Sequence, residues 1–354
     1  MVDLKNYICL VPFQHLQIHE KENWVCCPHW LTKEIPNKET LNQTWNSKEI
    51  IDIRKSVIDG SYRYCDRKSC PYLAELVNLN GGYIGPIIHK KDLPANIKKY
   101  YDSQEGEMQE GPTNVQLNFD PSCNYKCPSC RSELFVSDKK EIPRFRDKII
   151  EVENIFADSI EMLYSSTTGD PFFSKPIREY FQNFNPKKYP KLRYIHLHTN
   201  ASLWNEKMWN TMPNIHKYVK TCEISIDAAT KDTYENHTRI GGNWDNLINN
   251  LKFISTIKSL KSVKCSFVVQ SSNYKEMSSF VDLVKDIFKD KGKVFFCRLQ
   301  DWNSYSPAQF MLNKIHDISH PEHLNFIEEF NKICFDRYVF HNLHEYIKMN
   351  KKIF

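Results

Sequence analysis

The sequence predicts an α/β protein with a parallel sheet, and three observations lead to this fold class. Short apolar runs with the periodicity of strands recur between residues 113 and 299. Longer segments with apolar residues at three- and four-residue spacing lie between them, which is typical of amphipathic helices. Six strands alternating with helices favour a parallel arrangement such as an incomplete barrel. In such folds the reactive side chains gather at the carboxyl ends of the strands.

The predicted elements follow in chain order. The segment 115–119 (Val-Gln-Leu-Asn-Phe) alternates with period two and predicts the first strand. The other strand candidates are 158–164, 192–198, 221–226, 263–269 and 293–299. The segments with helical spacing are 143–156, 176–184, 205–217, 244–257 and 277–289. The tail from 309 to 354 also has a helical pattern.

The composition indicates a folded globular chain. Its 354 residues are 41% hydrophobic and 13% aromatic, which excludes disorder as the main state. The net charge is +5, and the lysine-rich spots are short and lack the interleaved aromatic residues of a nucleic-acid-binding face. The first residues do not form a signal peptide, and no stretch approaches the roughly 18 apolar residues of a membrane span. We therefore expect a cytoplasmic protein that binds neither nucleic acid nor membranes.

The 12 cysteines are distributed unevenly along the chain. They make up roughly 3% of the residues, below the ~8–10% of a disulfide scaffold, and in the cytoplasm such clusters indicate metal ligands or redox groups. One group lies in the first 70 residues and a second at 123–130, whereas four cysteines occur singly, at 222, 265, 297 and 334. Glycine and proline punctuate residues 78–112 between the two groups, which predicts a linker.

Cys123, Cys127 and Cys130 follow the first predicted strand in a loop that contains proline. Three thiolates at spacings of four and three can converge on one inorganic centre. Three ligands are one short of a closed site, and an open coordination position is what a catalytic metal centre needs. A zinc site with three cysteines is the alternative interpretation of the same spacing.

The CxxxCxxC motif after the first strand resembles the signature of the radical S-adenosylmethionine (radical SAM) enzymes. The resemblance implies that the three cysteines hold a 4Fe–4S cluster, whose fourth iron is chelated by the methionine part of S-adenosylmethionine. It implies reductive cleavage to a 5′-deoxyadenosyl radical, which abstracts a hydrogen atom from an organic substrate. It also implies a partial (β/α)6 TIM-like barrel, and a reductant such as flavodoxin or ferredoxin as a partner.

Later segments resemble the same family in order. Residues 166–172 (Ser-Thr-Thr-Gly-Asp-Pro-Phe) are similar to the GGE-type loop that holds the methionine amino group. In this loop a Thr replaces the first Gly and an Asp replaces the Glu, and a carboxylate suits an ammonium group by charge-assisted hydrogen bonding. Residues 199–201 (Thr-Asn-Ala) resemble the usual Thr-Asn-Gly. The cofactor contacts implied by these two segments are Thr168, Gly169, Asp170, Pro171 and Asn200.

Residues 225–242 resemble the "SIDA…TYE…R…GG" stretch of family members that carry extra clusters. By this resemblance Ser225 contacts the ribose, Arg239 pairs with the methionine carboxylate, and Asp227 belongs to the same cofactor site. Ser129 stands where the family has an aromatic residue near the adenine, and Tyr125 is expected to supply that ring instead.

Single residues at the end of the sixth strand are the catalytic candidates. Arg298 stands where the family lines its active site, and Cys297 is a candidate because some relatives use a thiol to return a hydrogen atom to a substrate radical. The single cysteines at 222 and 265 are expected in the core. His196 and His198 lie two apart on one strand and so share a face, where we expect them to bind a polar substrate by hydrogen bonds.

The N-terminal region carries its own cysteine set. Residues 16–18 and 24–25 predict a hairpin and 46–58 a helix, and cysteines on such elements can fold onto one cluster. One count has four ligands, which are Cys9, either Cys26 or Cys27, Cys65 and Cys70. The stretch resembles the SPASM/twitch module with its "CxxPW…L.I…CC…IWNS…R" pattern, which implies one auxiliary 4Fe–4S cluster. A structural zinc ribbon is the alternative.

The predicted organisation has four parts. A SPASM/twitch-like domain spans 1–95, a linker 96–112, a radical SAM partial barrel 113–308, and a C-terminal helical extension 309–354. The module is associated with peptide-modifying enzymes, so the expected substrate is a ribosomally made peptide, with a sugar or another small metabolite as the alternative. A non-catalytic iron–sulfur or zinc protein, acting as scaffold or electron carrier, is the competing class. Epimerisation, crosslinking and dehydrogenation are not separated by these residues.

Overall fold

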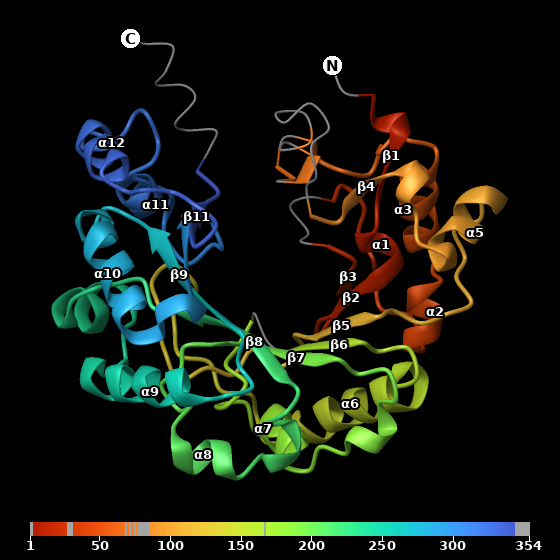
Figure 1. Ribbon diagram of the computed structural model, residues 1–354, viewed down its shortest axis with the longest axis horizontal. Coiled ribbons are helices and arrows are strands. Elements are labelled where there is room, and N and C mark those ends of the chain that lie inside the picture. The colour runs from red at the N-terminus through yellow and green to blue at the C-terminus, as the bar shows by residue number, and fades with distance from the viewer. Residues whose placement is uncertain are drawn as a thin grey trace. The chain divides into compact units, whose positions relative to one another are not determined.

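The computed structural model of the chain describes residues 3–26, 31–67, 69–70, 72–73, 76, 85–165 and 168–343. The chain divides into two compact units. The first comprises Met1–Asp120, Lys140–Ser165 and Asn185–Arg193, and the second comprises Pro121–Lys139, Ser166–Phe184 and Tyr194–Phe354. Each unit combines helices with parallel strands, so the predicted α/β class with a parallel sheet is confirmed (Figure 1).

The first unit begins with two small antiparallel pairs. Strand β1 (Tyr7–Cys9) pairs with β4 (Ile87–His89), and β2 (His15–Ile18) pairs with β3 (Asn23–Trp24), which confirms the predicted hairpin. The helix α1 (Val11–Gln14) connects β1 to β2. Strand β2 also pairs in parallel with β5 (Asn114–Leu117), the first strand predicted for the barrel region. The N-terminal hairpin thus extends the same sheet as the strand that leads to the cysteine motif.

Strand β5 pairs in parallel with β6 (Met162–Ser165). Between these strands in the chain, α6 (Ile142–Phe156) begins with proline in its first turn and buries one apolar stripe. The stripe consists of Phe145, Ile149, Val152 and Phe156, whose spacing of three and four residues keeps them on one helix face. The other helices of this unit within the described residues include α2 (Leu41–Trp45), α3 (Lys48–Ile58) and α5 (Ala95–Ser103), with short 3-10 turns at Leu4–Asn6, Lys90–Asp92 and Pro186–Lys188. Helix α5 lies within the segment predicted as a linker.

A buried arginine on α3 joins the helices of the first unit. The Arg54 side chain is fully buried, and its Nε donates to the carbonyl of Pro12 at 2.8 Å. Its Nη1 donates to Asn46 Oδ1 at 3.1 Å and to the carbonyl of Gly106 at 2.9 Å, while the guanidinium lies 4.1 Å from the Trp45 ring centroid. One cation therefore satisfies acceptors on three separate segments, and it has no carboxylate partner within the described part of this unit.

The described part of the second unit contains five parallel strands. They are β7 (Tyr194–Thr199), β8 (Val219–Ser225), β9 (Ser262–Val269), β10 (Gly292–Arg298) and β11 (Val339–His341). The first four agree with the predicted strands to within two residues. The prediction of a wholly helical tail is wrong, because β11 pairs with β10 and the Phe340 ring stacks on Phe295 at 5.1 Å. Residues 344–354 of that predicted tail lie outside the described residues.

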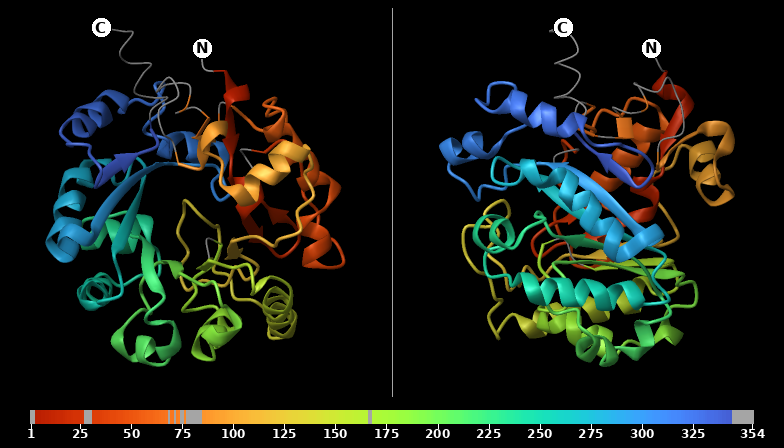
Figure 2. Two further views of the ribbon diagram at one scale, coloured as in Figure 1. Left: turned by 45° about the vertical axis from the view of Figure 1, so that its right-hand side comes forward. Right: turned by 60° about the vertical axis from the view of Figure 1, so that its left-hand side comes forward.

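Helices α7 (Lys175–Gln182), α8 (Glu206–Asn210), α9 (Trp244–Thr256) and α10 (Met277–Phe288) lie along one side of these strands (Figures 1 and 2). The predicted helix at 205–217 is broken into α8 and a 3-10 turn at Pro213–Ile215, since proline lacks the amide donor that a continuing helix needs. Further 3-10 turns lie at Tyr274–Glu276 and Lys289–Lys291, and the tail holds α11 (Pro307–Asn313) and α12 (His323–Asn331). No helix in the described part of the chain is long and apolar enough to cross a membrane.

The burial of Arg54 leads to a stability prediction. The Arg54→Met substitution leaves the carbonyls of Pro12 and Gly106 without their donor, so the free energy of unfolding should fall by about 3 kcal/mol. Urea denaturation followed by circular dichroism measures this change. Arg63→Met is the matched control. The Arg63 side chain is 47% exposed, so its ion pair with Asp59 should contribute less than about 1 kcal/mol to the free energy of unfolding. Equal effects of the two substitutions would contradict the assignment.

Candidate functional site

The predicted cysteine motif lies on one compact loop of the second unit. The amide of Cys123 donates to the carbonyl of Phe135 at 3.0 Å, and the amides of Cys130 and Arg131 both donate to the carbonyl of Cys127, at 2.9 and 3.0 Å. These bonds close a turn around the second cysteine. Cys123 and Cys127 are buried, whereas Cys130 is exposed.

Each of the three sulfur atoms accepts a hydrogen bond from a different side chain. Asn200 Nδ2 lies 3.7 Å from Cys123 Sγ, Arg239 Nη1 lies 3.4 Å from Cys127 Sγ, and Arg131 Nη2 lies 3.8 Å from Cys130 Sγ. Burial raises the pKa of Cys123 to about 12 and also raises that of Cys127, against the opposing effect of the arginines. Thiolates in this loop therefore require a cation or a metal centre to offset their desolvation.

This donor set fits an anionic iron–sulfur cluster. Hydrogen bonds to the cysteine sulfurs are one means by which proteins set the reduction potential of such clusters. Two of the three donors here are cationic. Among the described residues, no group of three or more His, Cys, Asp or Glu side chains is arranged to hold a single metal ion. The assignment of Cys123, Cys127 and Cys130 as cluster ligands stays a prediction.

Arg239 also forms a buried ion pair. Its Nη2 lies 2.6 Å from Asp227 Oδ2, and Asp227 Oδ1 accepts the amide of Val268 at 2.7 Å. Burial lowers the pKa of Arg239, but the nearby Asp227 and Cys127 raise it. The raising effects together outweigh burial, so the pKa of Arg239 lies above its ordinary value. The Nε of Arg239 is buried and has no hydrogen-bond partner among the residues described. This cationic side chain thus retains one N–H that an anionic ligand can satisfy.

Two glycines allow the Arg239 segment to lie against the cysteine loop. The amide of Lys126 donates to the carbonyl of Ile240 at 2.9 Å, and Gly241 has a φ of +96°, which favours glycine. A Cβ on Gly242 would lie 2.6 Å from Tyr234 Cε1 and 2.9 Å from the carbonyl oxygen of Arg239. The positive φ of Gly241 and the close packing of Gly242 against Tyr234 therefore explain why both positions of the GG pair hold glycine.

Tyr125, the residue expected beside the adenine, is 1% exposed. Its ring packs edge-on against Tyr234, and the two hydroxyl groups lie 3.1 Å apart. Tyr234 belongs to the π-helix Thr233–Thr238, which precedes Arg239. Ser129, in the same cysteine loop, is also buried. Tyr125 thus links the cysteine loop to the segment that carries Arg239.

Asp170 is a buried carboxylate that accepts four hydrogen bonds. Its Oδ2 accepts Thr199 Oγ1 at 2.6 Å and the amide of Asn200 at 2.9 Å, and its Oδ1 accepts the amides of Phe172 and Phe173 at 3.0 and 3.2 Å. These four bonds use about all the acceptor positions of a carboxylate. The structure thus shows Asp170 placing Asn200, whose amide reaches Cys123. Contact with an ammonium group, the role that the resemblance implies, would have to replace one of these bonds.

The rest of the loop around Asp170 is only partly described. The carbonyl of Thr168 accepts Arg131 Nη2 at 2.6 Å, which joins this loop to the cysteine loop, and Gly169 and Pro171 flank Asp170. Ser166 and Thr167 lie outside the described residues. Ala201 has a φ of +60°, a left-handed conformation that favours glycine. The glycine of the Thr-Asn-Gly pattern would suit this backbone conformation.

The face of the strands that carries His196 and His198 is polar. His196 Nδ1 lies 2.7 Å from Thr221 Oγ1, and His198 Nε2 lies 3.0 Å from Ser225 Oγ. Burial lowers the pKa of His196 to about 3 and lowers that of His198, so both rings are neutral at pH 7. Ser225, expected at the ribose, also accepts from Ser266 Oγ at 3.3 Å.

The two catalytic candidates lie at the carboxyl end of β10. The thiol of Cys297 lies 3.7 Å from the carbonyl of Phe295, and burial raises its pKa well above the ordinary value, so the thiol is protonated at pH 7. The Arg298 amide donates to Asn342 Oδ1 at 2.7 Å. Their catalytic roles stay predictions. Cys222 and Cys265 are buried, as expected of core residues.

Sequence reasoning missed Gln270 and Tyr305, which form a pair near the same site. The Tyr305 hydroxyl donates to Gln270 Oε1 at 3.0 Å, and burial together with Asp227 and Cys127 raises the pKa of Tyr305 to about 12. Gln270 is fully buried, and within the described residues its Nε2 has no hydrogen-bond partner. The available signal was the position of Gln270 directly after the strand at 263–269, at the carboxyl end where such folds place reactive groups.

The first unit brings the N-terminal cysteines together. Cys9, Cys26, Cys65 and Cys70 line one cavity, whose other walls are apolar or aromatic and include Tyr62. Burial raises the pKa of Cys65 to about 12. Burial also raises the pKa of Cys9, and the nearby Cys70 and Cys65 raise it further. Cys27, the alternative to Cys26, lies outside the described residues. The cavity therefore contains four of the five predicted auxiliary ligands.

Comparison with known proteins finds similar solved structures, whereas no family model and no curated protein matches the sequence. SuiB of Streptococcus suis bound to precursor peptide SuiA is 14% identical, over 88% of this chain and 67% of that chain, with a TM-score of 0.47. TYW1 with a lysine-pyruvate adduct bound is 14% identical over 74% of this chain and 89% of that chain (TM-score 0.40). The protein anSMEcpe with bound AdoMet is 18% identical over 54% of this chain and 52% of that chain (TM-score 0.40).

The close approach at Gly242 leads to a prediction. In Gly242→Ala the added methyl group meets the buried Tyr234 ring and a backbone carbonyl, so the free energy of unfolding should fall by about 2 kcal/mol. Urea denaturation measures the change. Ser272→Ala, at an exposed position of the same unit, should change it by less than about 0.5 kcal/mol. A Gly242→Ala protein as stable as the wild type would show that the loop is not held this closely.

The neutral state of His196 leads to a prediction about pH. Its pKa is lowered from 6.5 to about 3, so an unfolded chain binds a proton below pH 6.5 that the folded chain does not. The stability that this ring contributes is complete above pH 6.5 and is lost as the pH falls. Between pH 7 and pH 5 the wild type should therefore lose about 2 kcal/mol more than His196→Asn, measured by urea denaturation at both pH values.

The control for this prediction is His237→Asn. The His237 side chain is 51% exposed, so His237→Asn makes the same substitution at the surface of the same unit. If His196→Asn and the wild type lost equal stability on acidification, His196 would be protonated in the folded chain.

Proposed function

We propose that this chain is a radical SAM enzyme that cleaves S-adenosylmethionine reductively at a 4Fe–4S cluster and abstracts a hydrogen atom from an organic substrate. One observation carries the proposal. The three sulfurs of a single CxxxCxxC loop each accept a hydrogen bond from a different N–H donor, which are Asn200, Arg239 and Arg131. Arg131 belongs to the loop itself, but Asn200 and Arg239 come from distant segments, and a motif that occurred by chance would have no reason to collect two such donors.

The residues around the loop suit the expected cofactors. Cys123, Cys127 and Cys130 would hold the cluster, and the free Nε–H of Arg239 suits the carboxylate of the methionine part, since a guanidinium binds carboxylates through several N–H groups. When bound, the cluster supplies the electron for reductive cleavage. Asp170 keeps Asn200 directed at Cys123, and Tyr125 with Tyr234 holds the Arg239 segment against the cysteine loop.

The polar face of β7–β10 supplies groups for a substrate. His198 is neutral, and its Nδ1 is buried with no hydrogen-bond partner in the described part of the chain, so it can bind a polar substrate group. Cys297 keeps its hydrogen on sulfur, which is the form that a hydrogen-atom donor requires. We propose Cys297 and Arg298 as the catalytic residues that act on the substrate, and Ser225 and Asp227 as contacts of the cofactor.

The first unit would hold an auxiliary 4Fe–4S cluster on Cys9, Cys26, Cys65 and Cys70. The cavity that these cysteines line supports this proposal, as does the match of the hairpin and of Trp45, Asn46 and Arg54 to the SPASM/twitch-like pattern. We further propose that the strands β5–β10 correspond to the partial (β/α)6 barrel and that the substrate is a ribosomally made peptide. A cytoplasmic reductant such as flavodoxin or ferredoxin would supply the electron. The boundaries at 95, 112 and 308 stay predictions.

Anaerobic reconstitution tests the proposed function. A protein with both clusters should bind about eight irons per chain and form 5′-deoxyadenosine from S-adenosylmethionine and dithionite, measured by iron assay and liquid chromatography. A fully loaded protein that forms no 5′-deoxyadenosine would refute the enzyme assignment. Zinc bound in place of iron would favour the competing class of scaffold proteins.

Cysteine variants separate the two proposed clusters. Cys127→Ala should bind about half of the iron and form no 5′-deoxyadenosine, because it removes a ligand of the SAM-binding cluster. Cys70→Ala should also bind about half of the iron, yet retain part of the cleavage activity without substrate. Cys334→Ala is the matched control, because Cys334 is an exposed free thiol and its loss should change neither value. Loss of 5′-deoxyadenosine in Cys70→Ala but not in Cys127→Ala would reverse the assignment.

A further inference from the structure

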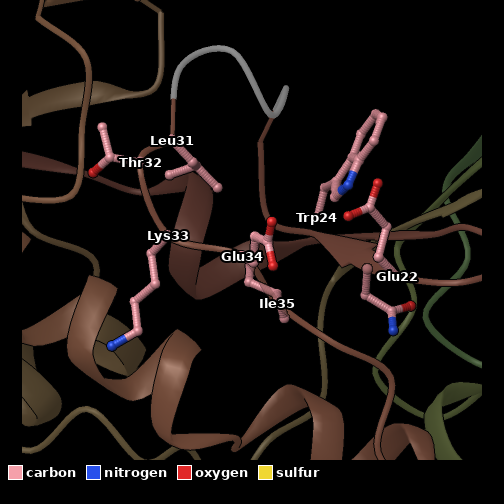
Figure 3. Close-up of a pocket in the computed structure, with 8 residues that line it drawn as sticks. Glu22, Trp24, Leu31, Thr32, Lys33, Glu34 and Ile35 are labelled. Carbon is pink, nitrogen blue, oxygen red and sulfur yellow. The ribbon is translucent and has the colours of Figure 1, made fainter.

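A second pocket of the first unit lies beside the β2–β3 hairpin (Figure 3). It has a volume of about 340 Å³, within the range of sites that take a side chain or a small ligand. Its two walls are the strand that carries Trp24 and the segment 31–35, which are joined by the hydrogen bond from the Asn23 amide to the Ile35 carbonyl at 3.0 Å. The pocket is therefore built by backbone pairing.

The charged groups that face this pocket are acidic. Figure 3 shows the Glu22 carboxylate beside the Trp24 indole and the Glu34 carboxylate on the opposite wall. Neither carboxylate forms an ion pair with any residue that the structure describes. The cation of the lining, Lys33, is directed away, because its Nζ lies 2.6 Å from Asp52 Oδ2 on α3. The pocket thus has a negative charge that no described residue neutralises.

A fully buried amide adds an acceptor to the same lining. Asn37 Nδ2 donates to the carbonyl of Glu20 at 3.2 Å, so the Asn37 oxygen faces Asn23 and receives the Asn23 Nδ2 hydrogen bond. This network orients Asn23, whose side chain is 0% exposed, and leaves its Oδ1 without a hydrogen-bond partner in the described chain. Buried polar atoms are almost always paired in native proteins, so an unpaired one in a pocket lining indicates a ligand.

Trp24 contributes an aromatic face and one donor. One side of its ring system lies on His19, with centroids 3.6 Å apart, which holds the indole in place. The indole Nε1 is buried and, among the residues described, has no hydrogen-bond partner. An aromatic face beside two carboxylates favours a cation, and the indole N–H favours a carbonyl oxygen close to it. A basic residue within a peptide carries both groups.

We infer that this pocket binds a lysine or arginine side chain of a peptide. Glu22, Glu34 and Asn23 Oδ1 accept from the ammonium or guanidinium group, and Trp24 packs on the cation and donates to a neighbouring peptide carbonyl. Leu31 lines both this pocket and the cavity of the N-terminal cysteines, so the bound peptide would pass beside the proposed auxiliary cluster. The inference rests on the proposed function only in taking the peptide to be the substrate.

Fluorescence anisotropy with the reconstituted full chain tests the inference. The probe is a fluorescein-labelled Gly-Lys-Gly-Gly amide, and its comparison is the same peptide with the lysine acetylated. The acetylated peptide should bind at least fivefold more weakly. The Glu22→Gln/Glu34→Gln double variant should bind the lysine peptide about tenfold more weakly, because the half-buried Glu22 and the exposed Glu34 each contribute a modest attraction. Raised salt should weaken binding to the wild type.

The matched control is Glu105→Gln/Glu107→Gln, which makes the same change in net charge at two exposed positions of the same unit. It should bind within twofold of the wild type. Equal binding of the acetylated peptide, or an unchanged affinity in the Glu22/Glu34 double variant, would overturn the inference. Putrescine that binds tenfold more tightly than the peptide would overturn the peptide assignment, because the site would then serve free amines.

Failure here can be distinguished from failure of the proposed function. Formation of 5′-deoxyadenosine without substrate does not involve this pocket, so the Glu22/Glu34 double variant should form it at the wild-type rate. A variant that loses peptide affinity and retains cleavage supports the inference. If the variant also lost cleavage, these carboxylates would be required for the folding of the unit, and the inference would be overturned.

Discussion

Four hydrogen bonds converge on the carboxylate of Asp170, and the arrangement of the candidate site depends on them. Burying a carboxylate costs free energy unless its oxygens accept hydrogen bonds. Moving a donor away from Asp170 would restore that cost, and this holds the donors in place. Two of these donors come from Thr199 and Asn200 at the end of β7, and the Asp170 amide donates to the carbonyl of Ser122 beside the first cysteine. The turn that carries Asn200 is thereby fixed relative to the cysteine loop.

The buried polar atoms that lack partners have a different meaning from those that are paired. Around Asp170 every acceptor position is used, which is typical of a structural network. At Arg239 Nε and Gln270 Nε2, and in the first unit at Asn23 Oδ1 and Trp24 Nε1, buried groups have no hydrogen-bond partner among the described residues. Because each such group costs stability, a ligand that pairs with it recovers that cost. In the second unit both unpaired atoms are N–H donors, which suit an anion or a carbonyl oxygen. In the first unit Asn23 Oδ1 suits a cation, whereas Trp24 Nε1 suits a carbonyl oxygen.

The local elements of the chain could be predicted from periodicity because each depends on neighbouring residues. The parallel strands and α6, α9 and α10 agree with their predicted ranges to within a few residues. The strand β11 could not be predicted, since three residues acquire a strand conformation by pairing with β10. Pro213 likewise interrupts a segment whose apolar spacing is helical, because a missing amide donor outweighs the pattern.

The sequence by itself determined which residues could carry the chemistry, because the spacing of Cys123, Cys127 and Cys130 and the GG after Arg239 are properties of the chain. Only the tertiary structure decided which groups meet. It brings Asn200 and Arg239 to the sulfurs of Cys123 and Cys127 and pairs Gln270 with Tyr305. It also places Cys26 in the cavity with Cys9, Cys65 and Cys70. Hydrogen bonds between residues more than seventy positions apart, such as that from Asn200 to Cys123, depend on how strands and loops pack, and no local pattern encodes them.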